Sequence, residues 1–206
     1  MKYAVTRFKS MELALKELEP FVKNGAHLQS GKPFEKFGGM RSREILANWL
    51  LCATKGAVEE LRLSFSTDPT GSDGIIRNDK SGETWPTEHV MVPRQSGNDI
   101  ADAQTLILEK IEQKRAKGGG QYASGKTLVV FLDAGPEAGQ WFPNRIAKAL
   151  PAPLLFETVW VVALQTVEDG AYTYAVTHLD ISNGDAPTFL VRISKDFDSW
   201  EVSSRQ

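Results

Sequence analysis

Residues 61–92 read LRLSFSTDPTGSDGIIRNDKSGETWPTEHVMV, and the pattern of this stretch decides the fold. Leu61, Leu63 and Phe65 alternate with polar residues, which is the period of a strand with one buried face. Glycine, proline, asparagine and aspartate then mark two turns. We therefore expect a three-strand meander, with strands at 61–66, 73–77 and 85–92 and turns at 68–71 and 78–82.

Helical patterns flank this meander in the sequence. Upstream, apolar residues at helical spacing predict one helix between Ser10 and Asn24 and another from Arg41 to Ala53, ended by Gly56. Downstream, residues 127–132 (TLVVFL) are continuously apolar, as in a central strand covered on both faces. The remaining expected elements are helices at 99–117 and 140–150 and strands at 158–164, 172–177 and 189–193. This order predicts an α/β fold.

Composition narrows the class of protein. A chain of 206 residues fits one domain, and 41% hydrophobic with 24% charged residues is typical of a globular protein. The lone cysteine, Cys52, excludes an internal disulfide and a cysteine-rich zinc site, and its apolar neighbours predict a buried thiol. Without a signal-peptide pattern or a run of 18 apolar residues, we expect a cytoplasmic protein with no membrane partner. A net charge of −2 means that nucleic-acid binding would need a local basic patch.

Residues 120–127 (GQYASGKT) match the phosphate-loop pattern GxxxxGK[ST] letter for letter. In that motif a strand precedes the loop and a helix follows it, so that amides at the helix N-terminus hold phosphates. Here the expected order is reversed, because a helical segment precedes the match and an apolar strand follows it. We therefore expect a helix-to-strand connection with a basic rim, and no nucleoside triphosphate as a ligand.

Two carboxylates are the most site-like feature of the meander. Asp73 begins its second strand and Glu88 lies within its third, so the roughly 4.8 Å spacing of neighbouring strands places both within reach of one cation. Mg²⁺ prefers oxygen ligands, usually one or two carboxylates with waters and substrate phosphates. Glu88 shares a strand face with Val90 and Val92, where a carboxylate is costly unless it is paired or metal-bound. The alternative is that Glu88 marks a solvent-facing strand end and Asp73 caps a turn.

Asp73-Gly74-Ile75-Ile76 and Glu88-His89-Val90 resemble the two acidic motifs of the PD-(D/E)XK nuclease-like superfamily. The resemblance covers residues 41–133 and implies a restriction-endonuclease-like α-β-β-β-α-β core with a mixed central sheet. Residues 1–40 would then be an N-terminal helix and loop. Residues 134–206 would be a C-terminal extension of one helix and three strands within the same single domain.

The resemblance also implies a site. In this superfamily a glutamate on the helix before the meander, here Glu44, often joins the two acids in holding Mg²⁺ or Mn²⁺. The superfamily lysine, which lies two residues after the second acid and assists the attacking water, is replaced by Val90. Some members supply that lysine from elsewhere, and Lys110 and Lys114, four residues apart on the next helix, are placed to do so. Arg77 is another candidate, and a solvated helix face is the alternative for the two lysines.

His89 adjoins Glu88 and is a candidate proton shuttle. Neighbouring strand residues point to opposite faces, however, so the alternative is a packed or surface histidine. The three histidines, at positions 27, 89 and 178, lack the HxxxH and HxH spacings of zinc hydrolases.

Together these residues predict a metal-dependent nuclease that hydrolyses phosphodiester bonds of DNA or RNA. Asp73, Glu88 and Glu44 would hold the Mg²⁺ or Mn²⁺ ion, and Lys110 or Lys114 would stabilise the developing charge. One alternative is a non-catalytic interaction module that keeps the nuclease-like fold, which the valine at position 90 favours. Another alternative is an unrelated α/β enzyme with a small-molecule pocket.

Overall fold

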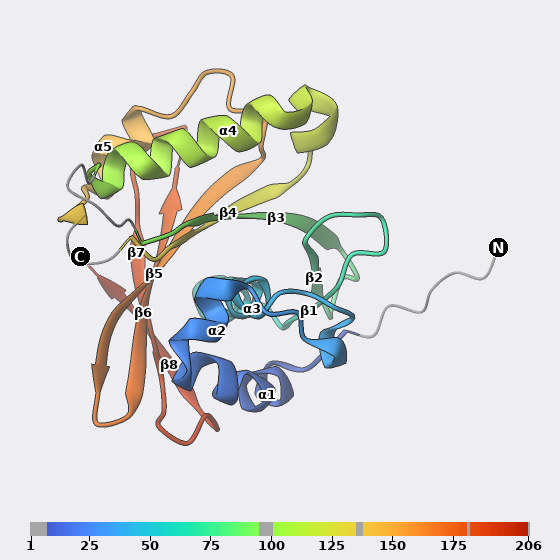
Figure 1. Cartoon of the computed structure of the whole chain (residues 1–206). Coiled ribbons are helices and arrows are strands. Elements are labelled where there is room, and N and C mark those ends of the chain that lie inside the picture. Colours follow the sequence, from blue (N-terminus) through green and yellow to red (C-terminus); the bar gives the residue numbers. More distant parts are fainter. Residues whose placement is uncertain (1–7, 95–100, 135–137, 181, 206) are drawn as a thin grey trace.

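The computed structural model of the chain describes residues 8–94, 101–134, 138–180 and 182–205. Within these residues the strands form one curled mixed sheet whose spatial order follows the sequence (Figure 1). The strands are β1 (Leu63–Ser66), β2 (Gly74–Asn78), β3 (Thr84–Val92), β4 (Thr127–Leu132), β5 (Thr158–Glu168), β6 (Ala171–Leu179), β7 (Thr188–Ile193) and β8 (Trp200–Arg205). β4 pairs parallel with both β3 and β5, and the other neighbours pair antiparallel. The predicted α/β class is confirmed.

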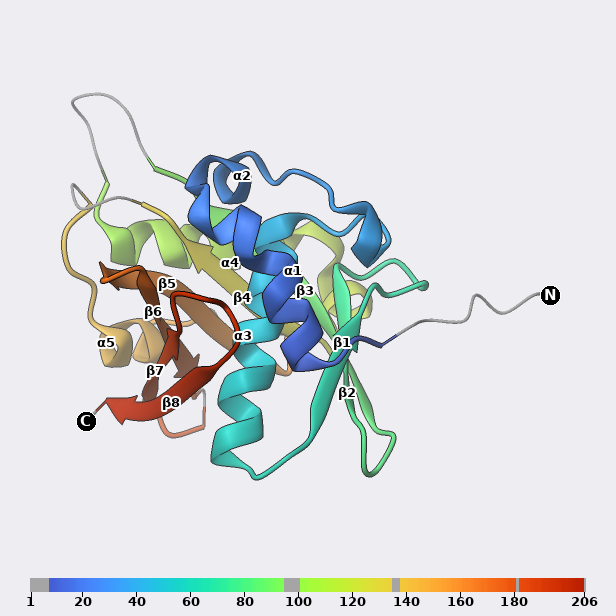
Figure 2. The same cartoon turned by 90° about the horizontal axis from the view of Figure 1, so that it is seen from below.

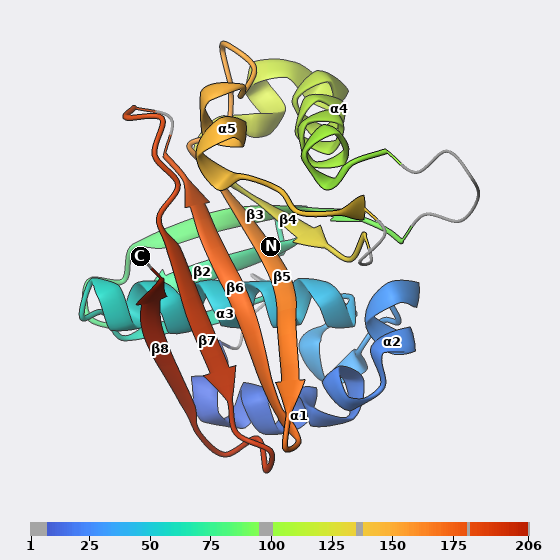
Figure 3. The same cartoon turned by 90° about the vertical axis from the view of Figure 1, so that its left-hand side faces the viewer.

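Helices cover both faces of this sheet. They are α1 (Met11–Lys23), α2 (Gly25–Ser30), α3 (Ser42–Val58), α4 (Ala103–Ala123) and α5 (Pro143–Lys148), with a 3-10 helix at Glu35–Phe37. α1, α2 and α3 lie on one side, and α4 and α5 lie on the other (Figures 1 and 2). The strands β5 to β8 pass across α3 (Figure 3), and the sheet bends so that α3 lies on its concave side (Figure 1). In the described part of the chain, no helix is long and apolar enough to cross a membrane.

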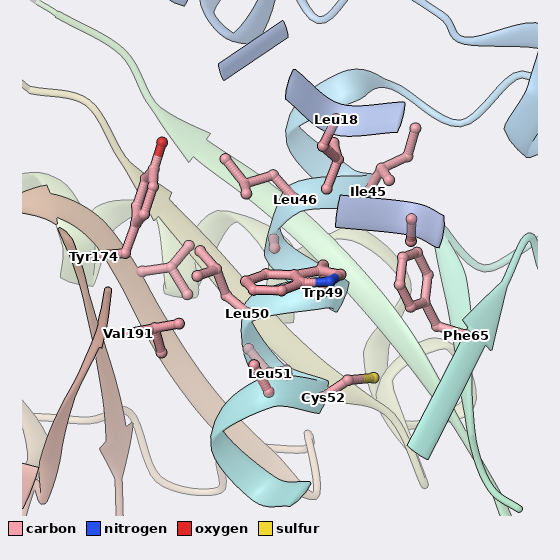
Figure 4. Close-up of a cluster of buried hydrophobic side chains, with 14 of the residues drawn as sticks. Leu18, Ile45, Leu46, Trp49, Leu50, Leu51, Cys52, Phe65, Tyr174 and Val191 are labelled. Carbon is pink, nitrogen blue, oxygen red and sulfur yellow. The ribbon is translucent and has the colours of Figure 1, made fainter. Parts of the chain in front are cut away.

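The larger core surrounds α3. This helix is apolar nearly all round and buries Trp49, Leu50 and Cys52 among residues of α1, β1, β6 and β7 (Figure 4). The Trp49 ring is fully buried, and its indole N–H donates to the backbone carbonyl of Met11 at 2.9 Å. Because a buried indole needs such an acceptor, this bond fixes α1 against α3. Cys52 is buried, as predicted.

The smaller core lies between α4 and the opposite face of the sheet. Leu128 and Val130 of β4 pack there, whereas Val129 and Phe131 belong to the α3 core. This alternation confirms that the apolar run at 127–132 is a strand covered on both faces. It also shows which residues of the neighbouring β3 face α4, because Glu88 pairs with Leu128 in the parallel register.

Several helices and strands differ from their predicted bounds. α3 continues to Val58, since one glycine in the last turn costs only about 1 kcal/mol. α5 begins at Pro143, a proline at the first helical position, and ends at Lys148, so it is shorter than the predicted 140–150. The helix α2 and the strand β8 were not predicted. Asp73 lies one residue before β2 instead of beginning it.

α4 shows the largest difference from its prediction. It runs through the glycine run to Ala123, with a kink at Gly119, where φ is 60° and ψ is −158°. The predicted start at residues 99 and 100 lies outside the described residues. The expected order of a helix before a strand is present around residues 120–127. The helix extends further than expected, because it includes residues 120–123.

Candidate functional site

Glu88 is a buried carboxylate in the middle of β3, with 3% of its surface exposed. Its Oε1 accepts a hydrogen bond from Nζ of Lys126 at 2.9 Å. Its Oε2 accepts bonds from Nζ of Lys114 at 3.1 Å and from the hydroxyl of Tyr122. Charge-assisted bonds of this kind are what make a buried carboxylate tolerable. Glu88 is therefore paired on the α4 side and does not mark a solvent-facing strand end.

Asp73 lies beside Glu88, in the turn that leads into β2. The Asp68 carboxylate accepts from the backbone amides of Thr70 and Ser72 and so shapes this turn. Asp73 Oδ2 accepts from the backbone amide of His89 at 2.7 Å and lies 3.6 Å from Nζ of Lys114. One ammonium group thus contacts both acids.

Lys114 reaches the acids because it continues the buried stripe of α4. Ile107 and Ile111 pack in the core, and Lys114 follows them at the spacing of one helix face. Burial lowers the pKa of Lys114, but Asp73, Tyr122 and Glu88 raise it, and the net shift is upward. The side chain therefore stays charged beside the two carboxylates.

The kink in α4 returns the chain to Glu88. Gly119 has backbone dihedrals that only glycine adopts readily, and a Cβ at Gly118 would lie 2.5 Å from Cβ of Tyr122. Beyond the kink, the ammonium groups of three lysines lie near the ring of Tyr122. The Nζ atoms of Lys126, Lys117 and Lys114 lie 4.5, 5.7 and 5.9 Å from its ring centroid. These distances are within the range of cation–π contacts.

Other predicted site residues have different partners. Nζ of Lys110 donates to Oε1 of Gln113 at 3.3 Å. Glu44 Oε2 accepts from the backbone amide of Arg41 at 2.9 Å and so caps α3. Burial raises the pKa of Glu44, and the charge of Asp73 adds to this. Over the residues that the structure describes, no three acidic, histidine or cysteine side chains are arranged to hold a metal.

No protein-family model matches the chain, and no curated protein matches it. What the site can bind therefore follows from its donor atoms. Asp73 Oδ2 and Glu88 Oε2 both contact one positive charge, the ammonium of Lys114. Two carboxylate oxygens that converge on one cation fit Mg²⁺ or Mn²⁺, whose other ligands are usually waters and substrate phosphates. Asp73 and Glu88 would hold such an ion.

His89 points to the opposite face of β3. It shares this face with Thr87, two residues earlier, whose hydroxyl donates to Asn48 Oδ1 on α3 at 2.8 Å. Neither ring nitrogen of His89 has a hydrogen-bond partner among the described residues, although Nδ1 lies 3.9 Å from Asp73 Oδ2. Burial lowers the pKa of His89 to about 4, so the imidazole is neutral at neutral pH. The imidazole is packed, as one of the two sequence-based interpretations expected.

Sequence reasoning missed Tyr122 and Lys126 as site residues. Both belong to the GQYASGKT stretch, whose pattern predicts a connection with a basic rim. The available signal was the position of Lys126 directly before an apolar strand, because a strand parallel to β3 in the right register places such a residue near Glu88. That signal becomes decisive only when the pairing of Glu88 with Leu128 is known.

A hollow of about 660 Å³ lies elsewhere, at the C-terminal end of α3 against β5, β6 and β7. Trp160 and His178 stack in its lining with ring centroids 4.5 Å apart. The hydroxyl of Thr158 bonds Nε2 of His178 at 2.7 Å. Neither Asp73 nor Glu88 lines this hollow, so it is separate from the acidic site.

Proposed function

We propose that this protein hydrolyses phosphodiester bonds of nucleic acids with a divalent metal ion held by Asp73 and Glu88. One observation carries the proposal: Nζ of Lys114 lies 3.1 Å from Glu88 Oε2 and 3.6 Å from Asp73 Oδ2. Two acids, one from the turn before β2 and one from β3, therefore share one cation position. A metal there would orient a water molecule and neutralise charge on the phosphate.

The proposal includes a restriction-endonuclease-like core. The order α3, β1, β2, β3, α4, β4 is the α-β-β-β-α-β order of that arrangement. α3 and α4 lie on opposite faces of the sheet (Figure 1). Asp73 lies directly before β2 and Glu88 lies within β3, which correspond to the acidic motif positions of the resemblance.

Lys126 takes the role of the lysine that Val90 replaces. Its Nζ lies 2.9 Å from Glu88 Oε1, so it reaches the second acid from the start of β4. An ammonium group fixed beside the reacting phosphate stabilises the negative charge that develops there. Lys117 adds a phosphate contact, because it is exposed at the kink and pairs with no carboxylate among the described residues.

A cleavage assay tests the proposal. Single- and double-stranded DNA and RNA are incubated with the protein and Mn²⁺, beside Asp73→Asn, Lys126→Met and the control Asp79→Asn. Asp79 pairs with Arg77 on the hairpin and not with the site residues. We expect about 100-fold or greater loss for the two site variants and wild-type cleavage for the control. Equal cleavage by the wild-type protein, the two site variants and the control would refute the proposal.

A non-catalytic interaction module is the second candidate. Both oxygens of Glu88 already bond to protein donors, so the cluster is complete without any ligand. Thermal stabilisation by Mn²⁺ separates the candidates, because a ligand that binds only the folded protein raises its Tm. The nuclease should gain stability from Mn²⁺ in a manner that depends on Asp73, and the module should gain none.

A further inference from the structure

Lys114 and a metal ion would need the same atoms. The ammonium of Lys114 contacts Oε2 of Glu88 and Oδ2 of Asp73. Lys126 contacts the other oxygen of Glu88 and therefore leaves this position to Lys114. A cation between the two acids would have to take the place of the ammonium group.

The folded chain needs a positive charge at that place. The Glu88 side chain is 4% exposed, and a second carboxylate, that of Asp73, lies 3.6 Å from the same ammonium. Two nearby carboxylates without a cation repel each other, and a buried charge without a partner is strongly destabilising. Lys114 therefore supplies the charge that a metal ion would otherwise supply.

Lys114 has a further partner beside the two acids. Its Nζ bonds the hydroxyl oxygen of Tyr122 at 3.2 Å, and Lys114 precedes the kink at Gly119 by just over one helical turn. Its long, flexible side chain can leave the acids without a change in the core. The displaced ammonium would then stay near Tyr122, where a substrate phosphate could accept its hydrogen bonds.

We infer that Lys114 is the chain's own counter-cation, which a divalent ion displaces from Asp73 and Glu88 when it binds. The inference rests on the proposed function, because it presumes that the acids hold a metal. It adds that the metal-free protein is stable by itself and that metal entry frees a lysine for the substrate.

Lys114→Met tests this exchange, because methionine keeps the length of the side chain and removes the charge. In EDTA we expect the variant to melt at a lower temperature than wild type. Mn²⁺ should restore the Tm of the variant. Calorimetric titration should show that Mn²⁺ binds the variant at least tenfold more tightly than it binds the wild-type protein. Lys110→Met, one helical turn earlier on α4 and bonded to Gln113, is the matched control and should behave as wild type.

A second measurement uses the wild-type protein and so does not depend on the folding of a variant. Lysines are labelled with an amine-reactive reagent, and the label at each position is counted by peptide mass spectrometry. Mn²⁺ should increase labelling of Lys114 and leave Lys110 unchanged. If Mn²⁺ binds both proteins equally and labelling of Lys114 does not change, the counter-cation role is overturned and the proposed nuclease stands. If Mn²⁺ binds neither protein, both fail.

Discussion

Nζ of Lys126 lies 2.9 Å from Oε1 of Glu88, although 38 residues separate the two in the chain. The contact arises because β3 and β4 run parallel, with Glu88 opposite Leu128. Lys126 lies one residue before β4 and two before Leu128, so its side chain is on the side of the sheet that Leu128 faces and extends to Glu88. The site is therefore assembled by three segments: the turn before β2, the strand β3, and the kinked end of α4 with the start of β4.

Replacing Glu88 should destabilise the fold. Glu88→Gln removes the negative charge that Lys114 and Lys126 share, and leaves two largely buried ammonium groups with fewer partners. We expect the free energy of unfolding to fall by about 3–5 kcal/mol, as when one member of a buried ion pair is removed. Urea denaturation followed by tryptophan fluorescence measures the loss. Glu112→Gln, at a surface pair with Arg115, should have little effect; equal loss in both variants would contradict the buried role of Glu88.

The kink in α4 should depend on Gly119 and not on Gly120. Gly119 has a φ of 60° and a ψ of −158°, so Gly119→Ala should cost about 1–3 kcal/mol in backbone strain. Gly120 has helical geometry, and no atom lies within 4 Å of a Cβ placed there. Gly120→Ala should therefore be neutral or slightly stabilising. Thermal melts of the two variants give the comparison, and a Tm that falls equally in both would refute the kink as the cause.

The buried His89 should make stability depend on pH. Its pKa is about 4 in the folded protein and 6.5 ordinarily, so the unfolded chain binds the extra proton first as the pH falls. The contribution of the neutral imidazole is complete above pH 6.5 and is lost progressively down to pH 4, by up to about 3 kcal/mol. His89→Leu removes this dependence, which the difference between variant and wild-type unfolding curves at several pH values will show.

A control for the pH experiment is His178→Gln. Burial also lowers the pKa of His178, so this variant should remove a separate contribution of the same sign. The difference in unfolding free energy between His89→Leu and the protein that keeps His89 must depend on pH in the same way when both carry His178→Gln. Parallel wild-type and His89→Leu curves between pH 4 and 7 would show that His89 does not titrate on unfolding.

Lys117 should contribute to nucleic-acid affinity through charge alone. Lys117→Gln is expected to weaken binding of oligonucleotides of any sequence and to reduce the slope of log affinity against log salt by about 1. Fluorescence anisotropy in EDTA measures binding without cleavage. Lys148→Gln, near Gly184 on the connection between β6 and β7, is a charge-matched control. An unchanged slope in Lys117→Gln would exclude a phosphate contact at this residue.

The sequence by itself determined the local features. Alternation at Leu61, Leu63 and Phe65 predicted the first strand, the apolar run at 127–132 predicted the central strand, and the acids of the meander were found together with the departure at Val90. These features follow from periodicity and turn chemistry over a few residues, which a single sequence carries.

Only the tertiary structure decided which charged residues meet. The lysine spacing on α4 left Lys110 and Lys114 equivalent, and the direction of the buried stripe selected Lys114. Tyr122 and Lys126 joined the site because Gly119 turns the chain and because β4 pairs in register with β3. Long-range strand register and the dihedral angle of one glycine leave no local pattern in the sequence, so the partners of Glu88 depended on them and could not be predicted.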